Sequence, residues 1–152
     1  MEPAMSRDVA LVSVSIDLGA GRRGVDMGPS ALRIAGITPA IESLGHVVRE
    51  IGTVTAGGFE TTDEGEVRTR FLEEIVSVGV RVGEMVRAGM AEGCLPLILG
   101  GDHSLSVGSV GAVAEHYRAL GEAIGLIWVD AHADMNRPET TPSGNVHGMS
   151  LA

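Results

Sequence analysis

Residues 96–104 read PLILGGDHS: a short apolar run is followed by two glycines and then by three polar residues. An apolar run that stops at glycine is typical of a strand buried on both faces of a sheet. Three other segments have the same character. The four expected strands are Val9–Ile16, His46–Ile51, Pro96–Leu99 and Ile124–Val129.

Helical patterns lie between these strands. Pro29 suits the first turn of a short helix over Ser30–Ala35, because the amide hydrogen that proline lacks would be unpaired there. The longest expected helix covers Glu66–Glu92, and its apolar face consists of Val67, Phe71, Ile75, Val78, Val82 and Met85. Two more helices are expected at Pro39–Leu44 and Ser104–Leu120. The alternation predicts an α/β fold with three layers, α/β/α, around a parallel sheet, and one domain over residues 1–152 without an internal boundary.

The composition excludes several classes of protein. The 152 residues carry 20 acidic and 11 basic side chains, giving a net charge of -9, and every basic residue is arginine. An acidic chain without a basic run is a poor partner for nucleic acids and anionic membranes. No apolar run approaches the roughly 20 residues of a transmembrane helix, and Met1–Asp8 lacks the basic start of an export signal. The single cysteine, Cys94, excludes an internal disulfide framework, so we expect a cytoplasmic protein.

One glycine motif suggests a nucleotide site, but its context argues against one. Gly19-Ala-Gly21-Arg-Arg-Gly24 has the spacing of a dinucleotide-binding loop, and Glu50 would be its ribose-binding acid. A helix that began at Gly21 would carry Pro29 in its interior, at a cost of about 3 kcal/mol. We therefore expect the helix to begin at Pro29 and the glycine loop to have a structural or substrate-side role.

Acidic and histidine side chains come directly after the third and fourth expected strands. Carboxyl ends of parallel strands meet at one edge of a sheet, and positions 130, 132 and 134 share one side if the extended backbone continues. Such a set would repel or remain poorly solvated without a cation. Carboxylate and imidazole ligands without thiolate suit Mn, Fe, Co or Zn, which predicts metal-assisted hydrolysis. The structural alternative is that Asp102 or Ser104 caps the following helix. The residues concerned are Asp102, His103, Asp130, His132 and Asp134.

Three segments carry a resemblance to a known family. They are GVDMGPSALR at 24–33, GGDHSLSVGS at 100–109 and VDAHADMNRPETTPSGNVHG at 129–148. In this order they resemble the N-terminal signatures of the arginase branch of the ureohydrolases. The resemblance implies two Mn²⁺ ions, with His103 and Asp134 on the first, His132 on the second and Asp130 bridging both.

The same resemblance implies a substrate site and a reaction. Asn136, Thr141, Ser143 and Asn145 would contact the amino-acid end of the substrate, and His147 would shuttle protons. With His147 and Asp134 as catalytic residues, a metal-bound hydroxide would attack the guanidinium carbon of L-arginine and yield L-ornithine and urea. The alternative for the loop residues is that their polar side chains hydrogen-bond within the loop. The loop favours arginine over agmatine as the substrate, and Arg137 is left without a role.

The resemblance covers about half of the family's fold. The family's later metal ligands and substrate-binding acids have no match here, so we expect the isolated chain to be inactive and to expose an apolar sheet edge. The full-length form would be a homotrimer or homohexamer. Two alternatives stay open: an agmatinase-type ureohydrolase, and a truncated, non-catalytic fragment that binds metal or oligomerises.

Overall fold

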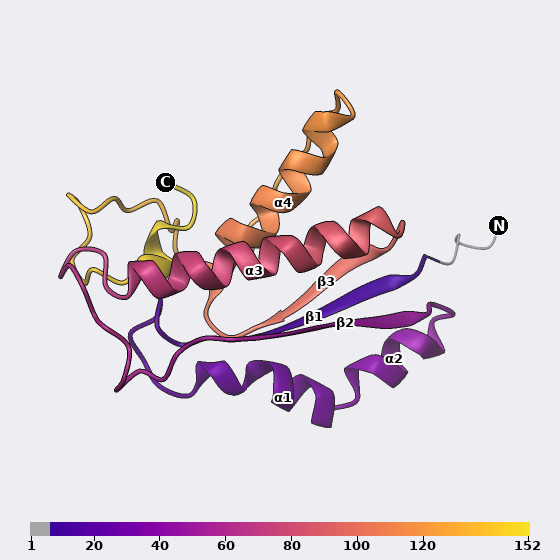
Figure 1. Ribbon diagram of the computed structural model, residues 1–152, viewed down its shortest axis with the longest axis horizontal. Coiled ribbons are helices and arrows are strands. Elements are labelled where there is room, and N and C mark those ends of the chain that lie inside the picture. The colour runs from indigo at the N-terminus through magenta and orange to yellow at the C-terminus, as the bar shows by residue number, and fades with distance from the viewer. Residues whose placement is uncertain (1–6) are drawn as a thin grey trace.

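The computed structural model describes residues 7–152 and contains a parallel sheet between two layers of helices (Figure 1). The sheet has the order β2-β1-β3, with β1 at Val9–Ser15, β2 at Val48–Thr55 and β3 at Leu95–Gly100. Helices α1, Gly28–Ile34, and α2, Ile37–Ser43, lie below the sheet in Figure 1, whereas α3, Leu72–Ala91, and α4, Ser106–Ala119, lie above it. Single 3-10 turns occupy Val25–Met27, His103–Leu105 and Val146–Met149. The expected α/β/α class is confirmed.

The central strand β1 is buried on both of its faces. Val12, Val14 and Ile16 belong to the same apolar core as Val78 and Val82 of α3. Side chains alternate along a strand, so the intervening Ser13 faces the opposite helical layer. There its hydroxyl oxygen accepts a hydrogen bond from Nη2 of Arg33 in α1 at 2.8 Å. A parallel strand covered on both faces explains why Val9–Ser15 is apolar almost throughout.

Helix α1 begins as the position of Pro29 predicts. It starts at Gly28, and Pro29 lies in its first turn. The guanidinium of Arg33 pairs with both carboxylate oxygens of Glu50, at 2.7 Å each, and this contact lowers the pKa of Glu50. Glu50 thus serves as an ion-pair partner that ties α1 to β2, and the glycine loop before α1 leads into a 3-10 turn.

The expected fourth strand, Ile124–Val129, does not form. Residues 122–130 have no regular secondary structure, and Ile127 and Val129 are 90% and 94% exposed. A strand needs a neighbour whose backbone completes its hydrogen bonds, and the ladders of the described residues join only β1, β2 and β3. The segment is apolar and rich in β-branched residues, but this composition alone does not make it pair with another strand.

Two other boundaries differ from the prediction by four residues or more. Helix α3 begins at Leu72 rather than at Glu66, because Phe71 has a left-handed backbone with φ of 58°. Val67 consequently lies outside the helix and is 77% exposed. Strand β2 continues past Ile51 to Thr55, where three β-branched residues follow Gly52. None of the helices in the described part of the chain combines the length and apolar character of a membrane span.

Helices α3 and α4 approach each other most closely at two glycines. A Cβ placed on Gly108 of α4 would lie 2.2 Å from the carbonyl oxygen of Gly79 in α3. A Cβ placed on Gly111, one turn further along α4, would meet nothing within 4 Å. The close crossing of α3 and α4 therefore requires glycine at position 108, whereas position 111 has room for a larger residue.

We predict opposite effects for the same substitution at these two positions. Gly108→Ala should lower the free energy of unfolding by about 1–3 kcal/mol, because the backbone carbonyl of Gly79 cannot move away without shifting α3. Gly111→Ala should raise it by about 0.5–1 kcal/mol, the usual gain of alanine inside a helix. Urea titration followed by circular dichroism measures both values. Equal effects of the two variants would contradict the close crossing.

Candidate metal and substrate site

The residues that follow β3 lie against the residues that follow β1. Gly101 N donates to the carbonyl of Val14 at 3.0 Å, and Asp102 N donates to that of Ile16 at 2.9 Å. The buried Asp102 carboxylate accepts hydrogen bonds from the backbone N–H groups of Ser104, at 3.0 Å, and Gly19, at 2.9 Å. Asp102 is thus a cap, as the structural alternative proposed, and it directs the next side chain, His103, toward the site.

Three of the expected metal ligands converge. Ligand atoms of His103, Asp130 and Asp134 all lie within 4.8 Å of one another. The Nε2 atom of His103 is 3.7 Å from Oδ2 of Asp130 and 4.0 Å from Oδ2 of Asp134. The Asp134 side chain is buried, whereas those of Asp130 and His103 are partly exposed. An imidazole and two carboxylates thus form a compact group of ligand atoms, with no hydrogen bonds between their side chains.

The fourth expected ligand, His132, lies outside this cluster. Its side chain is 83% exposed, and its Nδ1 lies 3.2 Å from Oδ1 of Asp130. The Asp130 carboxylate therefore directs one oxygen toward His103 and the other toward His132. The backbone N–H of His132 also donates to Oδ1, at 2.8 Å, and this bond is the main reason why the pKa of Asp130 is lowered. Asp130 is thus kept ionised between two imidazoles.

Asp134 reaches the cluster through a turn and not through a continued strand. The backbone bends at residues 131 and 132, and Asp134 has a left-handed conformation with φ of 50°. The simple alternation of positions 130, 132 and 134 is therefore not observed. The backbone carbonyl of Asp134 accepts a hydrogen bond from Leu151 N at 2.9 Å. This bond links Asp134 to the segment that follows His147.

Sequence reasoning missed Trp128. Its indole Nε1–H donates to Oδ2 of Asp134 at 2.9 Å, and its ring meets the His103 ring edge-on at 5.5 Å. Trp128 has the same parity as positions 130, 132 and 134, so on a continued strand its side chain would lie on the same side as theirs. That parity was the available signal.

The candidate proton shuttle, His147, lies next to His103. The two rings are 5.0 Å apart, and His147 N donates to the carbonyl of Gly19 at 3.2 Å. Burial lowers the pKa of His147, and the neighbouring imidazole of His103 lowers it further. The neutral form of His147 therefore predominates at neutral pH, where it can accept a proton.

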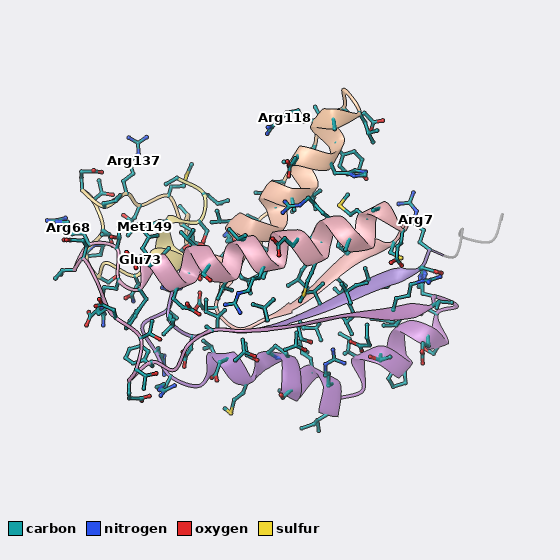
Figure 2. All side chains as sticks on the ribbon, viewed as in Figure 1. Arg7, Arg68, Glu73, Arg118, Arg137 and Met149 are labelled. Atoms are coloured by element: carbon teal, nitrogen blue, oxygen red, sulfur yellow. The ribbon has the colours of Figure 1, made fainter. Side chains whose placement is uncertain are left out.

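A pocket of about 420 Å³ opens beside the cluster. All four expected substrate-binding residues line it, together with two candidate ligands and the candidate shuttle. These residues are Asn136, Thr141, Ser143, Asn145, His132, Asp134 and His147. Arg137 is absent from this lining, and it directs its side chain away from the rest of the protein (Figure 2). The fold thus brings side chains that are up to 15 positions apart, from His132 to His147, around one pocket.

Several of these polar side chains also hold the loop together. Thr141 Oγ1 accepts a hydrogen bond from Gly144 N at 3.0 Å, and Ser143 Oγ accepts one from Asn145 N at 3.2 Å. The Asn145 amide donates to the carbonyl of Ala20 at 2.9 Å and accepts from Arg70 at 3.4 Å. Asn145 thereby links the pocket loop to the loop after β1 and to the segment before α3.

The donor set fits a divalent cation. Two carboxylates and an imidazole, without thiolate, form the kind of ligand group that Mn²⁺, Fe²⁺ or Zn²⁺ accepts. Nδ1 of His103 is buried and has no hydrogen-bond partner among the described residues, so the imidazole is held by packing alone. Its other nitrogen, Nε2, faces both carboxylates. A cation between them would relieve the repulsion of two anionic groups.

Comparisons with known proteins agree on one family. The profile of the arginase family matches residues 7–152. The arginase of Bacillus caldovelox is 42% identical over 147 residues, and the arginase of Brevibacillus brevis is 42% identical over 150. These alignments cover 96% and 97% of this chain but 48% of each relative. The crystal structure of the Bacillus caldovelox arginase matches with a TM-score of 0.87 and 41% identity, over 96% of this chain and 48% of that one. The chain thus spans about half the length of the curated relatives it matches.

The contacts of Asn145 predict a structural effect that needs no ligand. Asn145→Ala should lower the free energy of unfolding by about 1–3 kcal/mol, because the partly buried Ala20 carbonyl loses its donor. Ser143→Ala should lower it by about 0.5 kcal/mol at most, because water replaces the exposed hydroxyl. Both values come from urea titration. A Ser143→Ala variant as unstable as Asn145→Ala would show that the two side chains share one role.

Proposed function

Because the chain belongs to the arginase family, we propose that it forms the N-terminal half of a binuclear-manganese amidinohydrolase that converts L-arginine and water into L-ornithine and urea. The observation that carries this proposal is the convergence of His103, Asp130 and Asp134 beside a polar pocket of about 420 Å³. The pocket provides a substrate volume, and the cluster provides a cation site at its wall. The expected cytoplasmic location and the trimeric or hexameric assembly belong to the same proposal.

The two ions would be divided between the two sides of Asp130. His103 and Asp134 would hold the first ion, His132 would hold the second, and Asp130 would be a ligand shared by both. The opposed directions of the two Asp130 oxygens support this division. When bound, divalent ions supply the positive charge that lowers the pKa of water to near neutrality. Two carboxylates do not balance four positive charges, so the remaining ligands would come from a region corresponding to the relatives' second half.

The pocket loop would bind the amino-acid end of the substrate. Asn136 and Ser143 offer an amide and a hydroxyl group, which are neutral donors for an α-carboxylate. Thr141 and Asn145 line the same pocket, but their hydrogen bonds within the fold give them the additional task of holding the loop. A site built to bind a carboxylate leaves its donors unpaired when the substrate lacks one, which favours arginine over agmatine.

His147 would transfer the proton that the reaction requires. Its imidazole lies beside His103 and lines the substrate pocket. His147 would take a proton from solvent or from the site, and because burial lowers its pKa, its protonated form would readily give that proton to the leaving amine of ornithine. Asp134, whose side chain is buried and lines the same pocket, would orient the reacting groups.

We predict that Asp130→Asn weakens Mn²⁺ binding to the chain by about tenfold or more, because even the loss of an outer-sphere contact costs 10–100-fold. The matched control is Asp63→Asn, which removes one negative charge from another carboxylate that accepts a backbone N–H two residues further along the chain. The electron paramagnetic resonance signal of free Mn²⁺ measures the affinity. Equal affinities of the two variants would show that Asp130 is not a ligand.

The substrate is tested in a hybrid enzyme. Residues 7–152 replace the aligned half of the Bacillus caldovelox arginase, and urea release is measured with Mn²⁺ on L-arginine and on agmatine. We expect L-arginine to be preferred by at least about tenfold in kcat/KM, and Asn136→Ala to reduce that preference.

Two results of the hybrid assay would change the proposal. A preference for agmatine would assign the pocket to an agmatinase-type ureohydrolase. A hybrid that folds, by circular dichroism, but releases urea from neither substrate would favour a non-catalytic role for this half.

A further inference from the structure

We propose that Trp128 is a positioning residue for metal binding, which acts by fixing the carboxylate of Asp134. This inference rests on the proposed function, because it assumes that Asp134 is a metal ligand. The indole Nε1–H donates to Oδ2 of Asp134 at 2.9 Å, a short and well-formed hydrogen bond for a neutral donor.

The surroundings of Trp128 show that its inward direction is specific. Its neighbours Ile127 and Val129 are 90% and 94% exposed, and the segment has no strand partner among the described residues. Trp128 nevertheless turns inward and contacts two proposed ligands at once: it bonds Asp134 and meets the ring of His103 at 84° and 5.5 Å. The indole is therefore a contact between the irregular segment and two of the proposed ligands, in addition to Asp130 of the same segment.

Asp134 needs such a contact because its own backbone does not restrain it well. Its left-handed φ of 50° is a conformation that non-glycine residues rarely adopt, and it persists only where the surroundings impose it. Two hydrogen bonds do so here: Trp128 holds the carboxylate, and Leu151 N holds the backbone carbonyl at 2.9 Å. Loss of the indole bond would release the side chain while the backbone remains tied.

The charge of the donor also suits the task. An indole N–H carries no net charge, so it orients the carboxylate without repelling an incoming dication. The positive charge of an arginine in the same place would repel that ion. A carboxylate has about four lone-pair sites, so Asp134 can accept the indole N–H and still ligate a cation. Outer-sphere donors of this kind commonly contribute 10–100-fold to metal affinity.

The test compares Trp128→Phe with Tyr117→Phe in the 152-residue chain. Both variants remove one polar hydrogen from an aromatic side chain, but Tyr117 lies beside His116 in α4 and outside the cluster. We expect Trp128→Phe to weaken Mn²⁺ binding by about 10–100-fold and Tyr117→Phe to leave it unchanged, measured by the resonance signal of free Mn²⁺. Wild-type affinity in a folded Trp128→Phe variant would overturn the inference. No Mn²⁺ binding by the unaltered chain would instead overturn the proposed metal site.

A second measurement covers the case in which Trp128→Phe does not fold. Trp128 is the only tryptophan of the chain, so the ¹⁵N-labelled protein gives one indole N–H resonance. We expect this resonance to move on substitution of Asp134→Asn and on addition of Zn²⁺, a diamagnetic probe, and not on substitution of Asp63→Asn. An indole resonance that is insensitive to Asp134→Asn would overturn the hydrogen bond and the role derived from it.

Discussion

The backbone of Gly101 lies directly against the carbonyl of Ile16, and the position of the candidate site depends on this contact. A Cβ on Gly101 would be 1.9 Å from that oxygen, so no other residue permits the approach without a backbone shift. The contact brings the turn after β3 onto the loop after β1, where Asp102 bonds Gly19 N and caps the following 3-10 turn. His103 is the next residue, and its ring is therefore placed by the sheet itself.

The features that could be predicted from the sequence are those that depend on local chemistry. Pro29 marks the first turn of α1 because its ring fixes φ and it lacks an N–H, whereas Gly100 and Gly101 mark the end of β3 because glycine is unfavourable inside a strand and permits the turn that follows. The convergence of His103, Asp130 and Asp134 was also predicted, although Asp130 and Asp134 follow an irregular segment and not the expected strand. What could not be predicted depends on partners distant in the sequence. Ile124–Val129 has strand composition but pairs with no strand of the described residues, and Asp134 is held by Trp128 and Leu151 in a left-handed conformation that non-glycine residues rarely adopt.

The distribution of arginines leaves the cluster anionic. Arg33 pairs with Glu50, Arg49 with Asp8, and Arg87 with Glu115, all at the surface and away from the ligand group. The positive neighbours of Asp130 are imidazoles, which are charged only when protonated. A site that used arginine to balance its carboxylates would compete with a cation, whereas histidine can join the carboxylates in holding one.

The central position of β1 has a consequence for the order in which the protein forms. In the sheet Val9 pairs with Val48 on one side and with Leu95 on the other, which is 86 positions later in the chain. At the usual synthesis rate of 5–20 residues per second, the ribosome needs about 4–17 seconds to make that distance. During this interval the central strand has at most one of its two neighbours available, because β2 is made before β3. The nascent chain therefore passes through a stage in which the edge of β1 that later pairs with β3 is open and prone to aggregation, even after β2 has paired with the opposite edge.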